Sequence, residues 1–142
     1  MAMKKETICF DFDGVIHSYV SGWKGIDIIP NTIVPGIDGA IKLLRSEYRI
    51  VVHSTRCNEE KGLKAIKDYL DKNNIVVDDI VDRKPRAILY VDDRAFRFEG
   101  DISQLLLAVK HNKNNWINEI VGVFGEEGVN RILKTGIKND KK

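Results

Sequence analysis

The 142-residue sequence has few cysteines, little net charge and no long hydrophobic run. Cys9 and Cys57 are its only cysteines, too few for the disulfide framework of a small secreted domain. The first ten residues, MAMKKETICF, start with basic charge but contain only a short apolar stretch, so we expect no signal peptide. No apolar segment is long enough to span a membrane. These absences predict a cytoplasmic protein without a membrane partner.

The sequence also lacks internal repeats, low-complexity segments and a strong excess of one charge. Its formal net charge of +2 does not by itself indicate a nucleic-acid partner. The chain is 43% hydrophobic and 31% charged, a balance typical of a globular protein rather than a disordered one. Its length suits one domain with a core of its own. We therefore expect a single domain over residues 1–142.

What the sequence does contain is an alternation of short apolar runs and amphipathic segments. Apolar, β-favouring runs predict buried strands at residues 7–10, 49–53 and 87–91. The apolar residues at positions 37, 40, 41 and 44 have the spacing of one helix face. The predicted helices are 37–48, a second from an N-cap at Asn58 to about Lys72, and a third from Asp101 or Ser103 to about Lys110.

The remaining segments are less regular. Glycines and a proline interrupt residues 14–34, which predicts an irregular loop or small hairpin, a flap over one end of the domain. Residues 74–81 are predicted to be a short strand or turn. Further helices are expected to about Phe124, with Trp116 on an apolar face, and from about Glu126 to Gly136. Residues 101–142 would thus form a C-terminal helical extension.

Alternating strands and helices predict an α/β fold with a parallel sheet, a Rossmann-like three-layer α/β/α arrangement. Ligands bind such sheets beyond the carboxyl ends of the strands. Polar residues follow three of the predicted strands at these ends, namely Asp11 and Asp13, Ser54 and Thr55, and Asp92 and Asp93. We therefore expect their side chains to meet at one edge of the sheet.

Clustered carboxylates repel one another unless a cation lies among them. Oxygen ligands from separate strands suit Mg²⁺, which often shares its coordination shell with a phosphate. A hydroxyl group and Lys84 near the same edge would add hydrogen bonds and positive charge for a phosphoryl group. One carboxylate can then act as nucleophile and another as acid and base. Residues 11 and 13 of an extended chain point the same way, so both could face one ligand.

The segments "DFDGV", "VVHSTR" and "RKPRAILYVDD" together resemble the haloacid dehalogenase (HAD) superfamily of phosphohydrolases. The family pattern is a DxD strand end, a Ser or Thr strand end, a lysine, and a strand that ends in paired acids. All four motifs occur in this order within residues 7–93. The resemblance implies a Rossmann-like core, Mg²⁺ and phosphoryl transfer through an aspartyl-phosphate. Position 15, where many members have threonine, is valine here.

The resemblance implies a role for each matching residue. Asp11 corresponds to the nucleophile, and Asp13 to the acid and base, whose backbone carbonyl also binds Mg²⁺. Ser54 corresponds to the hydroxyl that holds the transferring phosphoryl group, although Thr55 beside it is an alternative match. Lys84 corresponds to the lysine that neutralises nucleophile and phosphate.

The paired acids Asp92 and Asp93 correspond to the Mg²⁺ ligands, with Asp93 the expected direct one. The sequence is also similar to a group of small HAD-type proteins, many of them phage-encoded and described only as hydrolases. "YVDDR" resembles the phosphatase domain of polynucleotide 5′-kinase/3′-phosphatase enzymes.

Three further residues are candidates for contacts with the substrate. Arg56 follows the second motif and can contact phosphate through two nitrogens, although a structural ion pair is an equal alternative. Trp23 and Lys24 lie in the loop over the predicted site, where Trp23 either stacks on a base or sugar or simply packs.

No segment is long enough to form the cap domain that closes many HAD sites over small substrates. We therefore expect a capless enzyme with an open site, unless a neighbouring subunit covers it. An open site suits a nucleotide, a nucleic-acid end or a phosphoprotein. The expected function is a Mg²⁺-dependent phosphatase. The alternatives are a receiver that forms a phosphoaspartate and a non-catalytic phosphate-binding module, but the order of the motifs and their intact residues favour the enzyme.

Overall fold

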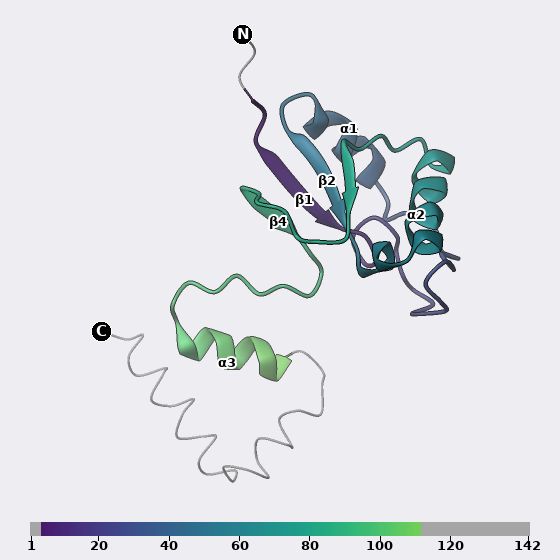
Figure 1. Ribbon diagram of the computed structural model, residues 1–142. Coiled ribbons are helices and arrows are strands. Elements are labelled where there is room, and N and C mark those ends of the chain that lie inside the picture. The colour runs from purple at the N-terminus through teal and green to yellow at the C-terminus, as the bar shows by residue number, and fades with distance from the viewer. Residues whose placement is uncertain (1–3, 112–142) are drawn as a thin grey trace. The chain divides into compact units, whose positions relative to one another are not determined.

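The computed structural model describes residues 4–111, and the chain divides into two units, Met1–Asp93 and Arg94–Lys142. The first unit contains the sheet and two α-helices, and the described part of the second contains one helix (Figure 1). The helices predicted to about Phe124 and from Glu126 to Gly136 lie outside the described residues.

Four parallel strands form the sheet of the first unit, in the order β3-β2-β1-β4. Their bounds are Thr7–Asp11 for β1, Arg49–His53 for β2, Asp79–Val81 for β3 and Leu89–Val91 for β4. In β1 and β2 the three middle residues are buried, as expected for the centre of a parallel sheet. The predicted α/β fold with a parallel, Rossmann-like sheet is thus confirmed.

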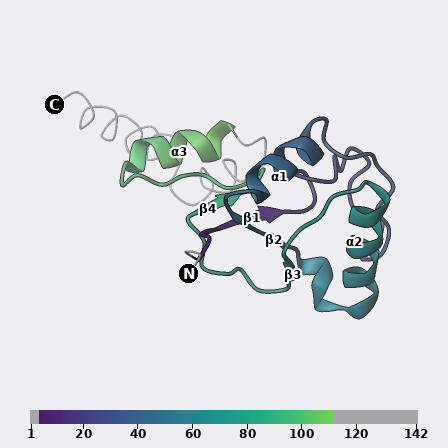
Figure 2. The same ribbon diagram turned by 90° about the horizontal axis from the view of Figure 1, so that it is seen from above.

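Two helices connect these strands, α1 at Ile37–Arg45 and α2 at Glu60–Lys72. Both lie on the same side of the sheet (Figure 2). Strands β1, β2 and β3 follow one another in the same direction across the sheet. Right-handed crossovers between them then place both helices on the same face. The core lies between the sheet and these two helices. It is built from apolar residues of β1, β2, α1 and α2: Ile8, Phe10, Ile50, Val52, Ile41, Ile66 and Leu70.

The predicted helical layer on the opposite face of the sheet is not present within residues 4–93. The connection between β3 and β4, residues 82–88, is too short for a helical crossover and contains no helix. Within this unit, one helical layer therefore covers the parallel sheet.

Two predicted helix boundaries also differ. Helix α1 ends at Arg45, three residues before the predicted end. Helix α2 begins at Glu60, and its N-cap is Glu59 rather than the predicted Asn58. Residues Thr55–Asn58 instead form the 3-10 helix η1, which Ser54 caps by accepting a hydrogen bond from the Arg56 N–H at 3.1 Å. The local cap at Ser54 therefore moves the start of α2 further along the chain.

The flap, residues 14–34, folds back on itself through backbone hydrogen bonds. The Ser18 N–H donates to the Thr32 carbonyl at 2.9 Å, and the Val34 N–H donates to the Ile16 carbonyl at 2.8 Å. The hydroxyl of Tyr69 on α2 donates to the carbonyl of Asn31 at 2.9 Å. The flap is therefore an irregular loop joined to α2.

In the second unit, α3 spans Ile102–His111. The carboxylate of Asp101 accepts a hydrogen bond from the Gln104 N–H at 3.2 Å, which caps the first turn. The predicted third helix is thus confirmed. None of the helices that the structure describes is both long and apolar enough to cross a membrane.

Candidate functional site

Three carboxylates meet at the carboxyl edge of the sheet. Asp11 is the last residue of β1, and Asp92 and Asp93 directly follow β4. Because β1 and β4 are neighbours with Phe10 beside Val91, the strand ends lie together. One carboxylate oxygen from each of the three aspartates lies within 4.8 Å of the other two. The predicted convergence of these acids is therefore present in the structure.

The electrostatics of Asp11 reflect this crowding. Its pKa lies above the usual value for aspartate, mainly because the side chain is partly buried. The Phe12 N–H, which donates to Oδ1 of Asp11 at 2.8 Å, acts in the opposite direction. The negative charges of Asp92 and Asp93 raise the pKa further. A cation among the three carboxylates would relieve this repulsion.

The chemistry of this cluster fits a hard divalent cation. It offers only oxygen ligands, from two separate strand ends, and Asp93 is exposed enough for a bound ion to keep water molecules. Both acids of the pair belong to the cluster, so each offers an oxygen that could bind an ion. The acids Asp11, Asp92 and Asp93 thus form a possible metal site.

The carboxylate of Asp13 is not part of this cluster, and the metal role predicted for Asp13 uses its backbone carbonyl instead. Oδ2 accepts from Arg56 Nε at 2.8 Å, and Oδ1 accepts from Arg56 Nη2 at 3.2 Å. Oδ1 also lies 2.8 Å from Nδ1 of His17. The Asp13 side chain is therefore oriented by protein contacts, which leaves only its backbone carbonyl for the metal role implied by the family.

Arg56 is completely buried, and its guanidinium group binds the protein rather than the solvent. Besides the two hydrogen bonds to Asp13, Nη1 donates to the carbonyls of Gly25, Ile26 and Ile28 at 2.7, 2.9 and 3.2 Å. Of the two alternatives left open by the sequence, the structure gives the ion pair. Arg56 is not placed to contact a substrate, because its nitrogens already bind Asp13 and the flap.

His17 completes the surroundings of Asp13 and was not among the predicted site residues. It is completely buried, and its Nε2 accepts a hydrogen bond from the Asn31 N–H at 3.1 Å. Since Nε2 accepts, the proton of a neutral ring lies on Nδ1, which donates to Asp13. The sequence offered one signal for this contact, a histidine four residues after Asp13. Only the fold shows that the His17 ring turns back toward the Asp13 carboxylate.

The two candidate hydroxyls follow β2 but differ in exposure. Ser54 is 4% exposed, and its oxygen accepts the capping hydrogen bond from Arg56. This bond leaves the hydroxyl proton available for donation. Thr55 is exposed at the start of η1. Both alternatives therefore remain at the same strand end.

Lys84 lies in the connection between β3 and β4. Its Nζ is 4.5 Å from the centre of the Tyr90 ring, a cation–π contact. Among the described residues it makes no hydrogen bond or ion pair with Asp11. Its charge acts on the buried thiol of Cys9, whose pKa is raised mainly by burial and lowered in part by Lys84.

The substrate-binding candidates Trp23 and Lys24 are both exposed in the flap. The Trp23 ring lies over the guanidinium of Arg56, with 4.6 Å between Cζ and the ring centre. The structure thus links Trp23 to Asp13 through one side chain, a relationship that the sequence did not indicate.

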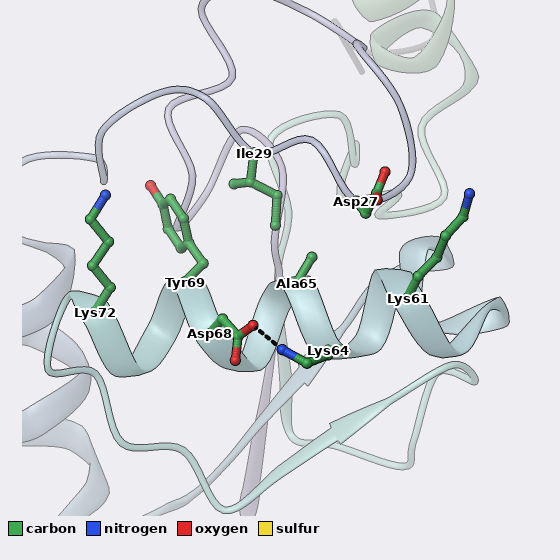
Figure 3. A pocket seen from close by; sticks show the side chains of 8 residues that line it. All are labelled: Asp27, Ile29, Lys61, Lys64, Ala65, Asp68, Tyr69 and Lys72. Atoms are coloured by element: carbon green, nitrogen blue, oxygen red, sulfur yellow. Dashed lines mark hydrogen bonds and ion pairs between the residues drawn. The ribbon is translucent and has the colours of Figure 1, made fainter.

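A separate cavity of about 430 Å³ lies between α2 and the flap (Figure 3). Ile29 and Ala65 face its centre, and Lys61 and Lys72 stand toward its two ends. None of the predicted site residues lines it. The cavity is therefore distinct from the acidic cluster.

Comparison with known proteins gives no identification: no family model matches the chain, and no curated protein or solved structure matches it. What is shown is a small α/β domain with a four-strand parallel sheet and a possible acidic metal site.

Proposed function

We propose that the chain is a Mg²⁺-dependent phosphomonoesterase of the HAD type, which acts through an aspartyl-phosphate on Asp11. The observation that supports this most strongly is the meeting of Asp11, Asp92 and Asp93 at one sheet edge, beside the strand end that carries Ser54 and Thr55. The resemblance of four motifs, in order, to the HAD pattern implies these roles for the same residues, which is why we prefer a phosphatase to an unspecified metal-binding domain.

In the first step, a carboxylate oxygen of Asp11 attacks the phosphorus of a phosphomonoester, and the bond between phosphorus and the ester oxygen breaks. Asp13, which has to carry a proton on Oδ1 in this step, gives that proton to the departing oxygen. In the second step, Asp13 removes a proton from water as the water attacks the aspartyl-phosphate. Inorganic phosphate leaves, and Asp11 and protonated Asp13 are regenerated.

The contacts of Asp13 define what this role requires. Oδ1 accepts from His17 at 2.8 Å and, more weakly, from Arg56 at 3.2 Å, whereas within residues 4–111 Oδ2 accepts from Arg56 alone. About 16% of the Asp13 side chain is exposed. In our proposal Oδ1 is the oxygen that exchanges a protein contact for the departing group, while Arg56 Nε keeps the carboxylate in place through Oδ2.

Mg²⁺ bound by Asp11, Asp92 and Asp93 would supply positive charge for the oxygens of the phosphoryl group. Ser54 or Thr55 donates a hydrogen bond to the same oxygens. In our proposal the ammonium group of Lys84, which contacts the Tyr90 ring in this structure, exchanges that contact for one with the phosphate. Because the Tyr90 ring is exposed and the lysine side chain is flexible, breaking this contact costs little free energy.

The test is hydrolysis of an aryl phosphate by wild type, with and without Mg²⁺, beside the variants Asp11→Asn and Asp27→Asn. Asp27 is an exposed acid of the flap outside the cluster, so its variant is the matched control. We expect Mg²⁺-dependent turnover in wild type and Asp27→Asn, and none in Asp11→Asn.

Absence of turnover in the wild type, or its persistence in Asp11→Asn, would contradict the proposal. Stable phosphorylation of Asp11 without turnover, detected by intact mass, would favour the receiver alternative.

A further inference from the structure

Trp23 has an unusual position for a large aromatic residue. One face of its ring lies on the guanidinium of Arg56, at 4.6 Å from Cζ to the ring centre, and the residue is 54% exposed. The opposite face of the ring is therefore open to solvent. A tryptophan that packs on one side only adds little to a core, but it offers a flat apolar surface to a ligand.

The support under this ring is rigid. Arg56 is completely buried, and its Nη1 binds three flap carbonyls within five residues after Trp23. The cation under the ring and the fixed backbone beside it hold the indole in place before any ligand arrives. Preorganisation of this kind lowers the entropic cost of binding.

The same guanidinium connects the ring to the candidate site. Arg56 Nε lies 2.8 Å from Oδ2 of Asp13, two residues after Asp11. One side chain thus separates the indole from the acid and base, much as one sugar separates the base of a nucleotide from its phosphate. The exposed ammonium group of Lys24, next to Trp23, adds positive charge on this side of the flap.

We propose that Trp23 is a specificity-determining residue that stacks on the nucleobase of a substrate whose phosphomonoester lies at Asp11. This inference rests on the proposed phosphatase function and names its substrate class. The recognised chemistry is a phosphomonoester one sugar away from a base, as in a mononucleotide or at a phosphorylated oligonucleotide end. Stacking tolerates any base, so selection is for a base rather than for a sequence.

Binding can be tested without turnover. The sequence has two tryptophans, so Trp116→Phe leaves Trp23 as the only one, and Asp11→Asn is added to prevent hydrolysis. We expect adenosine 5′-monophosphate to quench the Trp23 fluorescence saturably, and ribose 5-phosphate to leave it unchanged. No quenching by the nucleotide, or equal quenching by both compounds, would overturn the proposal.

Selectivity gives a second readout. The ratio of kcat/KM for adenosine 5′-monophosphate to that for ribose 5-phosphate should fall about tenfold in Trp23→Leu, the loss expected for one stacked base. Val20→Ala, at an 81% exposed position of the same flap, should keep the wild-type ratio. An unchanged ratio in Trp23→Leu would count against stacking.

A 5′-phosphorylated oligonucleotide in the same assays separates the two sources, since the better substrate of the two identifies the natural form of the ligand. The two proposals also fail differently. Quenching by the nucleotide without any hydrolysis by wild type would support stacking and refute the phosphatase, whereas hydrolysis without a preference for a base would do the reverse.

Discussion

The carboxylate of Asp93 lies directly against the backbone of Gly14. A Cβ atom built on Gly14 would overlap this carboxylate, and the residue has a φ of +85°. The turn after Asp13 therefore needs glycine for two reasons, its left-handed conformation and the close approach of an acid from the end of β4. This contact joins the first and last motifs of the site.

Gly14→Ala should weaken Mg²⁺ binding, because the added methyl group displaces Asp93 from Asp11 and Asp92. We expect the Mg²⁺ concentration for half-maximal thermal stabilisation to rise roughly tenfold or more. Gly22→Ala is the matched control, since Gly22 has a φ of +73° and nothing within 4 Å of an added Cβ. Both variants lose about 1–2 kcal/mol from backbone strain, but only Gly14→Ala should change the Mg²⁺ requirement. Equal Mg²⁺ requirements would show that Asp93 is not a ligand.

Asp11→Asn should stabilise the protein in metal-free buffer at neutral pH. The folded-state pKa of Asp11 lies above its unfolded value, so the folded protein binds this proton more readily and the charged carboxylate opposes folding. The gain in Tm should shrink as the pH falls through the raised pKa, where wild-type Asp11 becomes neutral too. Thermal melts from neutral to acidic pH measure the difference in Tm between Asp11→Asn and wild type, with Asp27→Asn as control. If Asp11→Asn is no more stable than wild type at neutral pH, the prediction is wrong.

Arg56→Met should be among the most destabilising substitutions in the first unit. It leaves the Asp13 carboxylate without its ion pair and removes the Arg56 hydrogen bonds of three flap carbonyls, of which that of Gly25 keeps the Ile28 N–H as a donor. The expected cost is about 3–5 kcal/mol. Arg49→Met breaks the exposed pair with Asp79 and should cost about 1 kcal/mol or less. Urea unfolding measures both. Similar losses would mean that Arg56 contributes no more than a surface arginine.

Tyr69→Phe should loosen the flap, because the hydroxyl donates to the Asn31 carbonyl. The expected loss is about 1 kcal/mol at neutral pH. Burial, with a smaller effect of the charge on Asp13, raises the pKa of Tyr69 to about 12 from an ordinary 10.0. The neutral phenol is thus favoured in the folded state, and its stabilisation is complete below pH 10 and lost as the pH rises toward 12.

Tyrosinate absorbance during an alkaline titration tests this shift. One of the four tyrosines should ionise near pH 12 in wild type and be missing from the Tyr69→Phe curve. Tyr48→Phe, which removes a phenol without a described hydrogen bond, should keep the late step. A late step retained in Tyr69→Phe would assign it to another residue.

The sequence predicted well those features that depend on neighbours along the chain. Apolar runs identified β1 and β2, and the spacing of residues such as Ile41 and Ile66 identified the faces of α1 and α2. Parallel strands must end at one edge, so the meeting of Asp11 with Asp92 and Asp93 also followed from local patterns. The predicted N-cap of α2, Asn58, was wrong. Ser54, four residues earlier, caps the 3-10 helix η1, and Asn58 is the last residue of η1.

The alternation of strands and amphipathic helices predicted helices on both faces of the sheet, but residues 82–88 connect β3 to β4 without a helix. A count of apolar segments does not show on which side of β1 a strand will pair. The order β3-β2-β1-β4, and with it the placement of both helices on one face, is decided only when the strands assemble.

The sequence by itself determined which acids stand at the strand ends, because short-range hydrophobic patterns define those ends. It did not determine the partners of Asp13 and Arg56, which are 43 residues apart. The residues next to an arginine in the sequence do not show whether its guanidinium group faces solvent, a phosphate or a buried carboxylate. Only the tertiary structure decided, since it buries Arg56 between Asp13 and the flap, where an unpaired charge would be too costly.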